Sequence, residues 1–345
     1  MTGELIGGLF GLAVSEPVGQ ARPLPDFLSN NALLTVNARS AIAILLAHWH
    51  PRRVWLPSYL CRALLDSARG AAEVAFYAVD YSLRPADLTW LEEVAAGDVV
   101  VVIDYFGFPA PLELVAGARN RGARVLEDGS QALLTTGVGS ATDAAVFSPR
   151  KFVGVPDGGA LIMAPGVAAP VASLGPPPEA WWTFAVEAAV RRAAFDAGSG
   201  DRGWYDLFRK AEDLAPAGHY AMSGVANELL STAIDYEEVA SSRRANYSRL
   251  CAALSGLALF PALPDEVVPL GFPVRLRSRD RVRESLHSLE IFAPTHWAIA
   301  PFVPPSFSDS HALSAAILTL PCDQRYDYRD MDRMAAIVVK EEGRA

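Results

Sequence analysis

Lys151 is the most informative residue in this chain. The 30 basic residues comprise 27 arginines and only three lysines, Lys151, Lys210 and Lys340. A lysine at position 151 therefore indicates chemistry that arginine cannot perform. Arginine stays protonated near neutral pH, whereas a lysine amine can lose its proton and attack a carbonyl carbon to form a Schiff base. The sequence predicts that Lys151 is such a nucleophile.

The residues around Lys151 belong to an alternating pattern of strands and helices. We expect strands at Val54–Leu56, Val74–Val79, Val99–Asp104 and Val125–Asp128, and helices after Ser40, at Ala63–Ala68, at Pro85–Ala95 and at Pro111–Arg121. This alternation predicts an α/β protein with a mostly parallel central sheet, which binds ligands beyond the carboxyl ends of its strands. Asp104, Asp128 and Ser148 fall at those ends.

The remainder of the chain predicts an insertion and a second domain. Residues 164–218 are rich in proline, tryptophan and glycine and indicate an insertion with a helix. We expect a long helix over Asn227–Leu254 with Arg243 and Arg244 on its polar side, then a strand at Phe272–Leu276 and helices at Arg279–Leu289 and Arg329–Val339. The predicted domains are a large α/β domain, residues 1–218, and a small α+β domain, residues 219–345.

Composition narrows the choice of partner. The chain has 345 residues, 51% of them hydrophobic, and a formal charge of −9, which argues against nucleic acid or an anionic membrane as the main partner. Its three cysteines are far apart and match no metal-ligand spacing. No stretch is long and apolar enough to span a bilayer. We therefore expect a cytoplasmic protein that binds small molecules.

Pyridoxal phosphate (PLP) suits the residues singled out so far. An enzyme that uses this cofactor needs a lysine for its aldehyde, a carboxylate for its pyridine nitrogen, and phosphate donors at the start of a helix. Lys151 and Asp128 supply the first two. Ser40 stands at the head of the first predicted helix, Ser148 follows a strand, and Gln131 is placed to bond the ring oxygen.

Several short motifs resemble those of one family. The matching stretches are Asn37–Ala41, Leu56–Tyr59, Tyr105–Pro109, Glu127–Ala132, Asp143–Ser148, Lys151 with Asp157–Gly159, His219–Ser223 and Leu320–Pro321. Together they resemble the DegT/DnrJ/StrS family of fold-type-I PLP-dependent aminotransferases, which is best known for nucleotide-sugar aminotransferases. The resemblance covers most of the chain apart from the insertion.

The resemblance implies a role for each matching residue. It implies Lys151 as the Schiff-base lysine, Asp128 on the pyridinium nitrogen, Gln131 on the phenolic oxygen, and Ser148 with Ser40 and Ala41 on the phosphate. It also implies a homodimer with composite sites, in which His219 stands where the family has an asparagine that reaches the partner's phosphate.

The chain departs from the family pattern at several positions. Ser148 and Lys151 are closer together than is usual, so a phosphate-binding role for Arg150 stays open. Cys61 stands where an aromatic residue usually stacks on the ring, and Tyr59 is the nearby candidate for that role. We interpret Trp181 and Trp297 as packing residues.

The expected activity is transfer of an amino group, from glutamate as donor, to a keto-sugar nucleotide or a related carbonyl acceptor. A PLP-dependent lyase or dehydratase is one alternative, although the family's dehydratase branch has histidine in place of this lysine. The other is a non-enzymatic sensor or regulator, which the departures at Cys61, His219 and Ala221 would fit.

Overall fold

A computed structural model describes residues 5–13, 24–29 and 31–344. Its centre is a seven-stranded sheet in the order β2-β8-β7-β6-β5-β3-β4. The strands are β2 (Leu33–Thr35), β3 (Arg53–Pro57), β4 (Glu73–Tyr77), β5 (Val99–Ile103), β6 (Arg124–Asp128), β7 (Ala144–Phe147) and β8 (Gly159–Met163). All neighbours from β7 to β4 are parallel, while β8 is antiparallel to both β7 and β2. The mostly parallel sheet expected from the sequence is confirmed.

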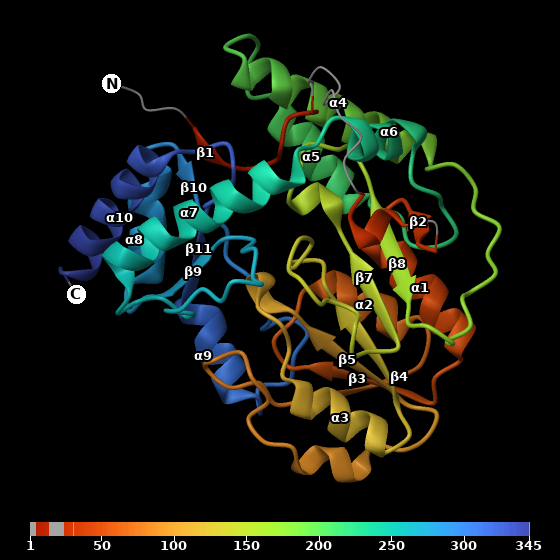
Figure 1. Cartoon of the computed structure of the whole chain (residues 1–345). Coiled ribbons are helices and arrows are strands. Elements are labelled where there is room, and N and C mark those ends of the chain that lie inside the picture. The colour runs from red at the N-terminus through yellow and green to blue at the C-terminus, as the bar shows by residue number, and fades with distance from the viewer. Residues whose placement is uncertain (1–4, 14–23, 30, 345) are drawn as a thin grey trace.

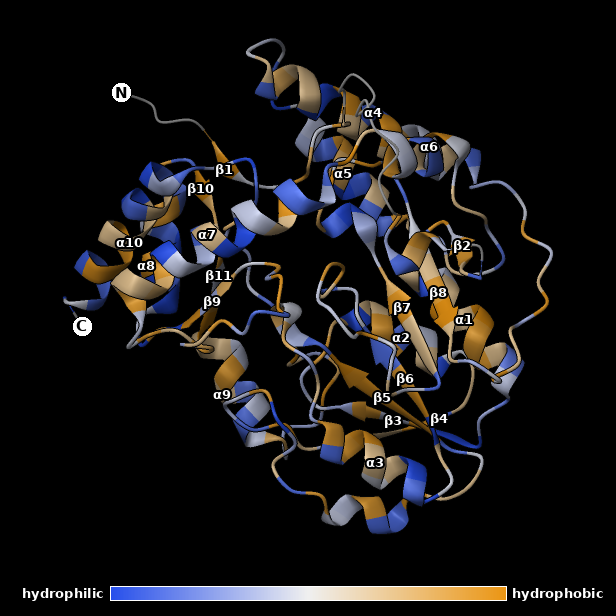
Figure 2. Ribbon diagram, in the orientation of Figure 1, coloured by the Kyte–Doolittle hydropathy of each residue, from blue (hydrophilic) through white to orange (hydrophobic). Residues whose placement is uncertain are grey.

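Helices cover both faces of this sheet, as the strand sequences require. Every residue of β5 is buried, and the strand carries a run of valines that has no polar face to leave in water. The helices nearest the sheet are α1 (Ala38–Trp49), α2 (Arg62–Arg69) and α3 (Leu112–Asn120) (Figure 1). In Figure 2 β5 and β7 are largely orange, whereas α3 carries both orange and blue residues. Short 3-10 turns complete this part at Asp26–Leu28, Thr89–Glu93, Tyr105–Gly107 and Pro149–Lys151.

The prediction of a helix at Pro85–Ala95 is wrong. Only Thr89–Glu93 coils, as a 3-10 turn. The N–H of Ala86 donates to the carbonyl of Ala78, which keeps the preceding segment extended. Asp87 then accepts hydrogen bonds from both the N–H and the hydroxyl of Thr89, a local side-chain turn that competes with helix formation.

The long helix expected at Asn227–Leu254 is two helices, α6 (Gly224–Thr232) and α7 (Tyr236–Leu254). The chain breaks between them because Asp235 caps α7 by accepting a hydrogen bond from the N–H of Glu238. Arg243 was expected on the polar side of this helix and is instead 0% exposed. Apolar periodicity alone cannot reveal an arginine that is buried among backbone carbonyls.

The insertion contains two helices, α4 (Glu179–Asp196) and α5 (Trp204–Asp213), joined by the expected glycine-rich turn. They pack against each other, and the indole N–H of Trp181 donates to the carbonyl of Ala211. In Figure 1 both lie beside the end of the sheet that carries β7 and β8. The insertion is therefore placed to cover the carboxyl end of β7.

The C-terminal part forms its own apolar cluster. The elements of the C-terminal part are β9 (Phe272–Arg275), α8 (Arg279–His287), β10 (Ile291–Phe292), α9 (Ser308–Ala316), β11 (Ile317–Leu320) and α10 (Tyr328–Glu342). The cluster takes buried residues from these elements and from α7, except that Leu313 of α9 packs in the core of the central sheet. β10 pairs in parallel with β1 (Ile6–Gly7), so the start of the chain joins the C-terminal part. α6 packs on the cluster around Phe147 and Phe152 instead. The domain boundary predicted at residue 218 stays a prediction. β1 pairs with a strand of the C-terminal part, and α6 packs on residues of the large domain, so contacts cross this boundary in both directions.

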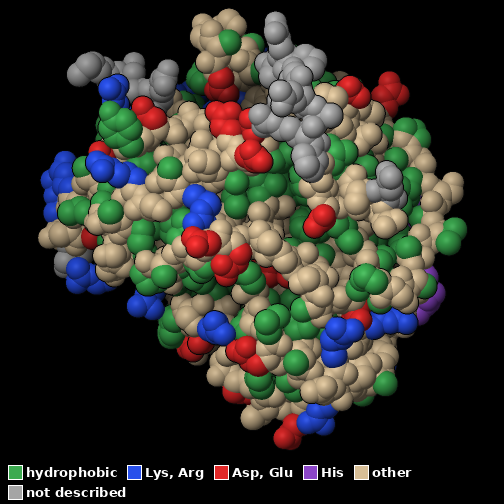
Figure 3. Space-filling view, in the orientation of Figure 1, with side chains coloured by type: hydrophobic (Ala, Val, Ile, Leu, Met, Phe, Trp, Pro, Cys, Tyr) green, Lys and Arg blue, Asp and Glu red, His purple; other side chains and the backbone are tan. Residues whose placement is uncertain are grey.

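The surface carries side chains of both charges (Figure 3). On the face in Figure 3 basic and acidic side chains are interspersed. Among the described residues, no helix is both long enough and apolar enough to cross a bilayer. Nor does the described part of the chain bring together three or more histidine, cysteine or acidic side chains that could hold a metal ion.

Candidate functional site

A cavity of about 340 Å³ opens at the carboxyl ends of β6 and β7. Asp128 ends β6, Ser148 follows β7, and Lys151 closes the turn after it; all three line the cavity. The other walls are the starts of α1 and α2, the insertion, and the loop before α9. Of the residues predicted at the strand ends, Asp128 and Ser148 therefore lie together, and Lys151, which was predicted on other grounds, lines the same cavity.

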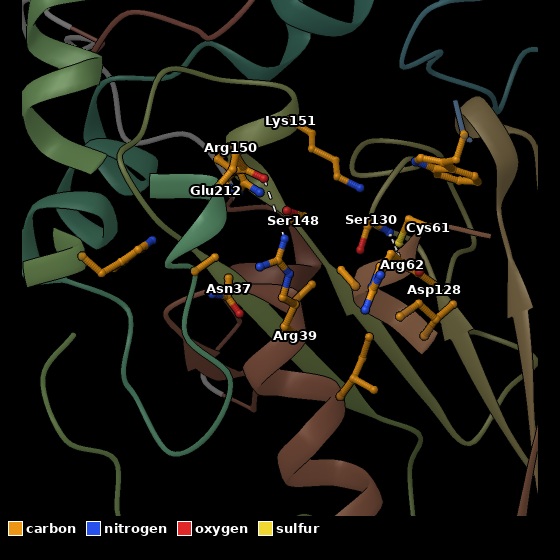
Figure 4. A pocket seen from close by; sticks show the side chains of 17 residues that line it. Asn37, Arg39, Cys61, Arg62, Asp128, Ser130, Ser148, Arg150, Lys151 and Glu212 are labelled. Carbon is orange, nitrogen blue, oxygen red and sulfur yellow. Dashed lines mark hydrogen bonds and ion pairs between the residues drawn. The ribbon is translucent and has the colours of Figure 1, made fainter. Parts of the chain in front are cut away.

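The turn that carries Lys151 is built by Pro149. Pro149 begins the 3-10 turn, and its carbonyl accepts the N–H of Phe152 at 2.8 Å. The turn directs the Lys151 side chain into the cavity (Figure 4). Within the described part of the chain the amine makes no hydrogen bond or ion pair, so it is available to a ligand.

Asp128 is the strand-end acid that reaches the cavity. It is 7% exposed, and its Oδ1 accepts the N–H of Ser130 at 3.0 Å. Asp104, the other acid at a strand end, does not line the cavity and accepts the N–H of Ala110. Burial, and then the neighbouring Glu127, raises the pKa of Asp104 well above its ordinary range. Of the two strand-end acids, only Asp128 is therefore placed to contact a ligand in the cavity.

Cys61 lies between the two key groups. It precedes α2, lines the cavity and is half-buried. Burial raises the pKa of its thiol; the charge of Lys151 lowers that pKa and the charge of Asp128 raises it. Lys151, Asp128 and Cys61 all line this one cavity.

The start of α1 forms the second wall. Asn37 caps the helix by accepting the N–H of Ser40 at 2.9 Å. Asn37, Ala38 and Arg39 line the cavity, whereas Ser40 and Ala41 lie behind them and are 0% exposed. The hydroxyl of Ser40 is buried and has no hydrogen-bond partner among the described residues.

Two arginines meet one carboxylate at this end of the cavity. Glu212 Oε1 lies 2.7 Å from Arg150 Nη1, and Glu212 Oε2 lies 3.7 Å from Arg39 Nη2 (Figure 4). Burial acts to raise the pKa of Glu212, but Arg150 and Arg39 more than offset it and hold the pKa below its ordinary value. With two cations to one anion, this end retains a positive charge. We name these three residues the anion end.

Aromatic side chains line the cavity where the sequence indicated packing alone. Trp181 reaches it from α4, and Trp297 from the loop before α9. Tyr59 does not line the cavity: it is 0% exposed, and its ring centroid lies 5.6 Å from that of Trp297. Burial, followed by the charge of Lys151, lowers the pKa of the adjacent His296 to about 3, so this histidine is neutral at pH 7.

Two further predicted residues lie outside the cavity lining. Gln131 is 2% exposed; its Oε1 accepts the N–H of Phe106 at 2.7 Å, and its Nε2 has no partner among the described residues. His219 is exposed, and its carbonyl accepts the N–H of Gly175. The roles inferred for both residues, like those of the other site residues, stay predictions.

Several cavity residues were not predicted from the sequence. Arg39 and Arg62 stand at helix starts, beside residues that were singled out, and that position was a usable signal. Glu212 gave none, because it lies in the insertion, more than sixty residues from Arg150 in the chain.

Comparisons with known proteins can now be set against this geometry. No protein-family model matches the sequence, and no curated protein matches it either. Solved structures do match. TlmJ, an aminotransferase from Streptoalloteichus hindustanus, has a TM-score of 0.64 and 20% identity, covering 89% of this chain and 84% of its own. A DegT DnrJ EryC1 StrS aminotransferase from Brucella abortus has a TM-score of 0.61 and 15% identity, covering 90% and 86%. The chain has the fold-type-I aminotransferase fold.

A third structure extends the likeness. PseC from Helicobacter pylori, an aminotransferase involved in the biosynthesis of pseudoaminic acid, has a TM-score of 0.65 and 16% identity, covering 91% of this chain and 87% of its own. The fold-type-I aminotransferase fold therefore extends over nearly the whole chain. Within it, the cavity lies where an open α/β sheet binds its ligand, beyond the carboxyl ends of the strands.

Proposed function

We propose that the protein is a PLP-dependent aminotransferase that moves an amino group from a small-molecule donor to a carbonyl acceptor. The observation that carries the proposal is the pair formed by Lys151 and Asp128 in one cavity with a positively charged end. The amine of Lys151 has no partner within the part of the chain that the structure describes, and Asp128 supplies a carboxylate. The likeness to solved aminotransferases supports it.

The cavity residues fit pyridoxal phosphate. Lys151 offers an amine to the aldehyde, and Asp128 a carboxylate to the ring nitrogen. Arg39 and Arg150 line the cavity and offer charged donors to a phosphate. Behind Arg39, the buried hydroxyl of Ser40 has no hydrogen-bond partner among the described residues. Ser148 and the helix start of α1 add further donors at the same end. When bound, this cofactor supplies an electron sink for the electrons left at the Cα of an amino substrate.

The protein's own groups would then move the protons. Lys151 would hold the aldehyde of the cofactor, and its neutral amine, once the donor amine has freed it, would be the base that takes the proton from Cα and gives it back to the cofactor. Asp128 keeps the ring nitrogen protonated, because a carboxylate beside a basic nitrogen favours the cation. Trp181 and Trp297 limit the water that reaches these groups.

The acceptor proposed is a keto-sugar nucleotide or a related carbonyl compound, with glutamate as donor. One structural neighbour, Spr1654 from Streptococcus pneumoniae, is described as a putative sugar aminotransferase, and the motif resemblance points to the same class. A cytoplasmic homodimer, with the loop around His219 near the partner's cofactor, belongs to the same proposal.

A half-reaction tests this proposal. The purified protein is loaded with pyridoxal phosphate and mixed with glutamate while the visible spectrum is recorded. We expect conversion to the amine form of the cofactor, with release of 2-oxoglutarate in equal amount. Cofactor that binds and is never converted by any amino donor would instead indicate a sensor or regulator, and release of ammonia would indicate a lyase or dehydratase.

A further inference from the structure

The backbone carbonyl of Phe152 is held by two side chains from distant parts of the chain. Arg243 Nη2 donates to it at 3.1 Å, and Gln324 Nε2 donates to it at 2.7 Å. Phe152 is the residue directly after Lys151 and is 0% exposed. Arg243 comes from α7, and Gln324 from the loop before α10. We name Arg243 and Gln324 the Phe152 clamp.

The clamp is itself a closed hydrogen-bonded unit. Arg243 Nε donates to Gln324 Oε1 at 3.0 Å, which fixes the amide so that its Nε2 faces Phe152. Arg243 Nη1 donates to the carbonyls of Pro269 and Leu270. The guanidinium carbon also lies 4.5 Å from the centre of the Phe152 ring. Both the backbone and the side chain of Phe152 are therefore held by Arg243.

Burying the charged guanidinium of Arg243 costs free energy, so its presence in the core requires an explanation. Arg243 is 0% exposed, and burial lowers the pKa of its guanidinium. Its direct partners among the described residues are three carbonyls and one amide oxygen, none of them a carboxylate. Well-packed apolar residues commonly replace buried charges without loss of stability. A charge kept here therefore indicates a need for one defined geometry.

The same arginine reaches the segment that orients Gln131. Leu270, whose carbonyl accepts from Arg243, donates its own N–H to the carbonyl of Phe106 at 2.9 Å. The N–H of Phe106 in turn donates to Gln131 Oε1. One guanidinium thus links the turn that carries Lys151 to the loop that fixes Gln131.

We propose that Arg243 and Gln324 are positioning residues for Lys151: by fixing the next carbonyl, they set the direction from which its amine enters the cavity. This inference rests on the proposed function, in which that amine attacks an aldehyde. A displacement of about 1 Å in a reacting group is enough to change rates by an order of magnitude or more.

The competing explanation is that the clamp only fastens α7 to the large domain. Arg244 provides the matched control, because it is the next residue on α7 and also donates to two carbonyls, those of Pro264 and Val267. The hydrogen bonds of Arg244 within the described residues go to Pro264, Val267 and Asp265, and none of them reaches the Lys151 turn. Loss of Arg244 therefore loosens the helix while leaving the Phe152 carbonyl held.

The test compares Gln324→Met, Gln324→Glu and Arg243→Lys with Arg244→Met. Gln324→Glu retains an acceptor for Arg243 and replaces the donor to Phe152 with a carboxylate, whereas Gln324→Met removes the donor without adding a charge. An effect shared by both variants is therefore due to the lost contact, even if a variant without Arg243 fails to fold. The readout is the rate at which the cofactor-free protein forms a borohydride-reducible adduct with pyridoxal phosphate, and with pyridoxal, which lacks the phosphate. We expect both rates to fall about tenfold in the Gln324 variants, and Arg243→Lys to fall between those and Arg244→Met, since lysine keeps the charge without the planar fork.

Rates in the Gln324 variants within twofold of Arg244→Met would overturn the proposal and leave a purely structural clamp. If the unmodified chain forms no adduct at Lys151, the proposed function fails, and the clamp is judged by acetylation of the cofactor-free protein. Lys210 and Lys340 are the internal references. A Lys151 acetylation rate that changes at least threefold against both references in Gln324→Met, and not in Arg244→Met, supports the clamp; an unchanged ratio refutes it.

Discussion

Arg150 Nη1 and Glu212 Oε1 lie 2.7 Å apart and join the turn that carries Lys151 to helix α5 of the insertion. Arg150 directly precedes Lys151, so this bond fixes one side of the turn while the Phe152 clamp fixes the other. It also turns a guanidinium toward the cavity, where Arg39 shares the same carboxylate. The insertion is therefore part of the site.

Arg150→Gln should weaken the binding of pyridoxal phosphate and leave that of pyridoxal unchanged. A hydrogen bond from a charged donor contributes about 1.5–3 kcal/mol, so we expect a loss of affinity of about tenfold or more. Equilibrium titration of the cofactor-free protein with both compounds measures it. Arg191→Gln, on an exposed face of α4, is the control. Equal losses for the two compounds would show that Arg150 does not bind phosphate.

Asp128→Asn should retain the cofactor and lose the chemistry. Asparagine keeps the shape of the side chain but cannot favour the protonated ring nitrogen. Removal of the Cα proton of glutamate should slow by about a hundredfold or more, measured in single-turnover half-reactions. Asp104→Asn is the comparison, because Asp104 does not line the cavity. If instead Asp104→Asn is the slow variant, the assignment of the two acids is reversed.

The buried contact between Asp157 and Ser223 predicts a pH dependence of stability. Asp157 is 2% exposed and accepts hydrogen bonds from the N–H and the hydroxyl of Ser223, which caps α6. Burial, only partly offset by these bonds, raises its pKa from 3.8 to about 6. Between these values the folded chain binds the proton more tightly than the unfolded chain. The stabilisation is therefore complete below about pH 4 and is lost as pH rises through 6, by up to about 3 kcal/mol.

Asp157→Asn should remove this contribution. Urea unfolding of both proteins between pH 4 and 7.5 measures it, as the difference between the two curves of unfolding free energy. The wild type should lose stability relative to the variant as pH rises through this range. The exposed Asp213→Asn should follow the wild type. Parallel curves for wild type and Asp157→Asn would contradict the predicted linkage.

The proposed composite site predicts a homodimer in which the loop around His219 approaches the partner's cofactor. His219 is exposed in the single chain, so a partner can reach it. His219→Ala should speed cofactor release by several-fold without changing the unfolding midpoint, since an exposed side chain contributes little to stability. Sedimentation at assay concentration measures the oligomeric state. A monomer with full activity would exclude the composite site.

The sheet and two of its site residues could be predicted because the signals are local. A valine run such as β5 has no polar face, and the residue after a parallel strand lies at the ligand-binding edge whatever follows it. Asp128 and Ser148 needed no more than that rule, although the rule also pointed to Asp104, which does not line the cavity. Lys151 was singled out because lysine is rare in this chain. The helix break at Asp235 was also local, but it was outweighed by apolar periodicity across it.

The remaining site residues depend on contacts that no local pattern encodes. Glu212 reaches Arg150 only because α4 and α5 fold over the end of β7. Trp181 and Trp297 are ordinary packing residues in sequence, and only the tertiary fold decides that one side of each ring faces a cavity. Arg243 shows the same limit, since its partners are mostly backbone carbonyls, which every residue possesses.

Mapping the cofactor attachment point tests the central claim most directly. The protein is incubated with pyridoxal phosphate, reduced with borohydride, digested and examined by mass spectrometry for the modified lysine. With only three lysines in the chain, the assignment is unambiguous. We predict the reduced adduct on Lys151 alone, and none in Lys151→Arg, which keeps the charge but cannot attack the aldehyde. An adduct on Lys210 or Lys340 with Lys151 unmodified would contradict the account.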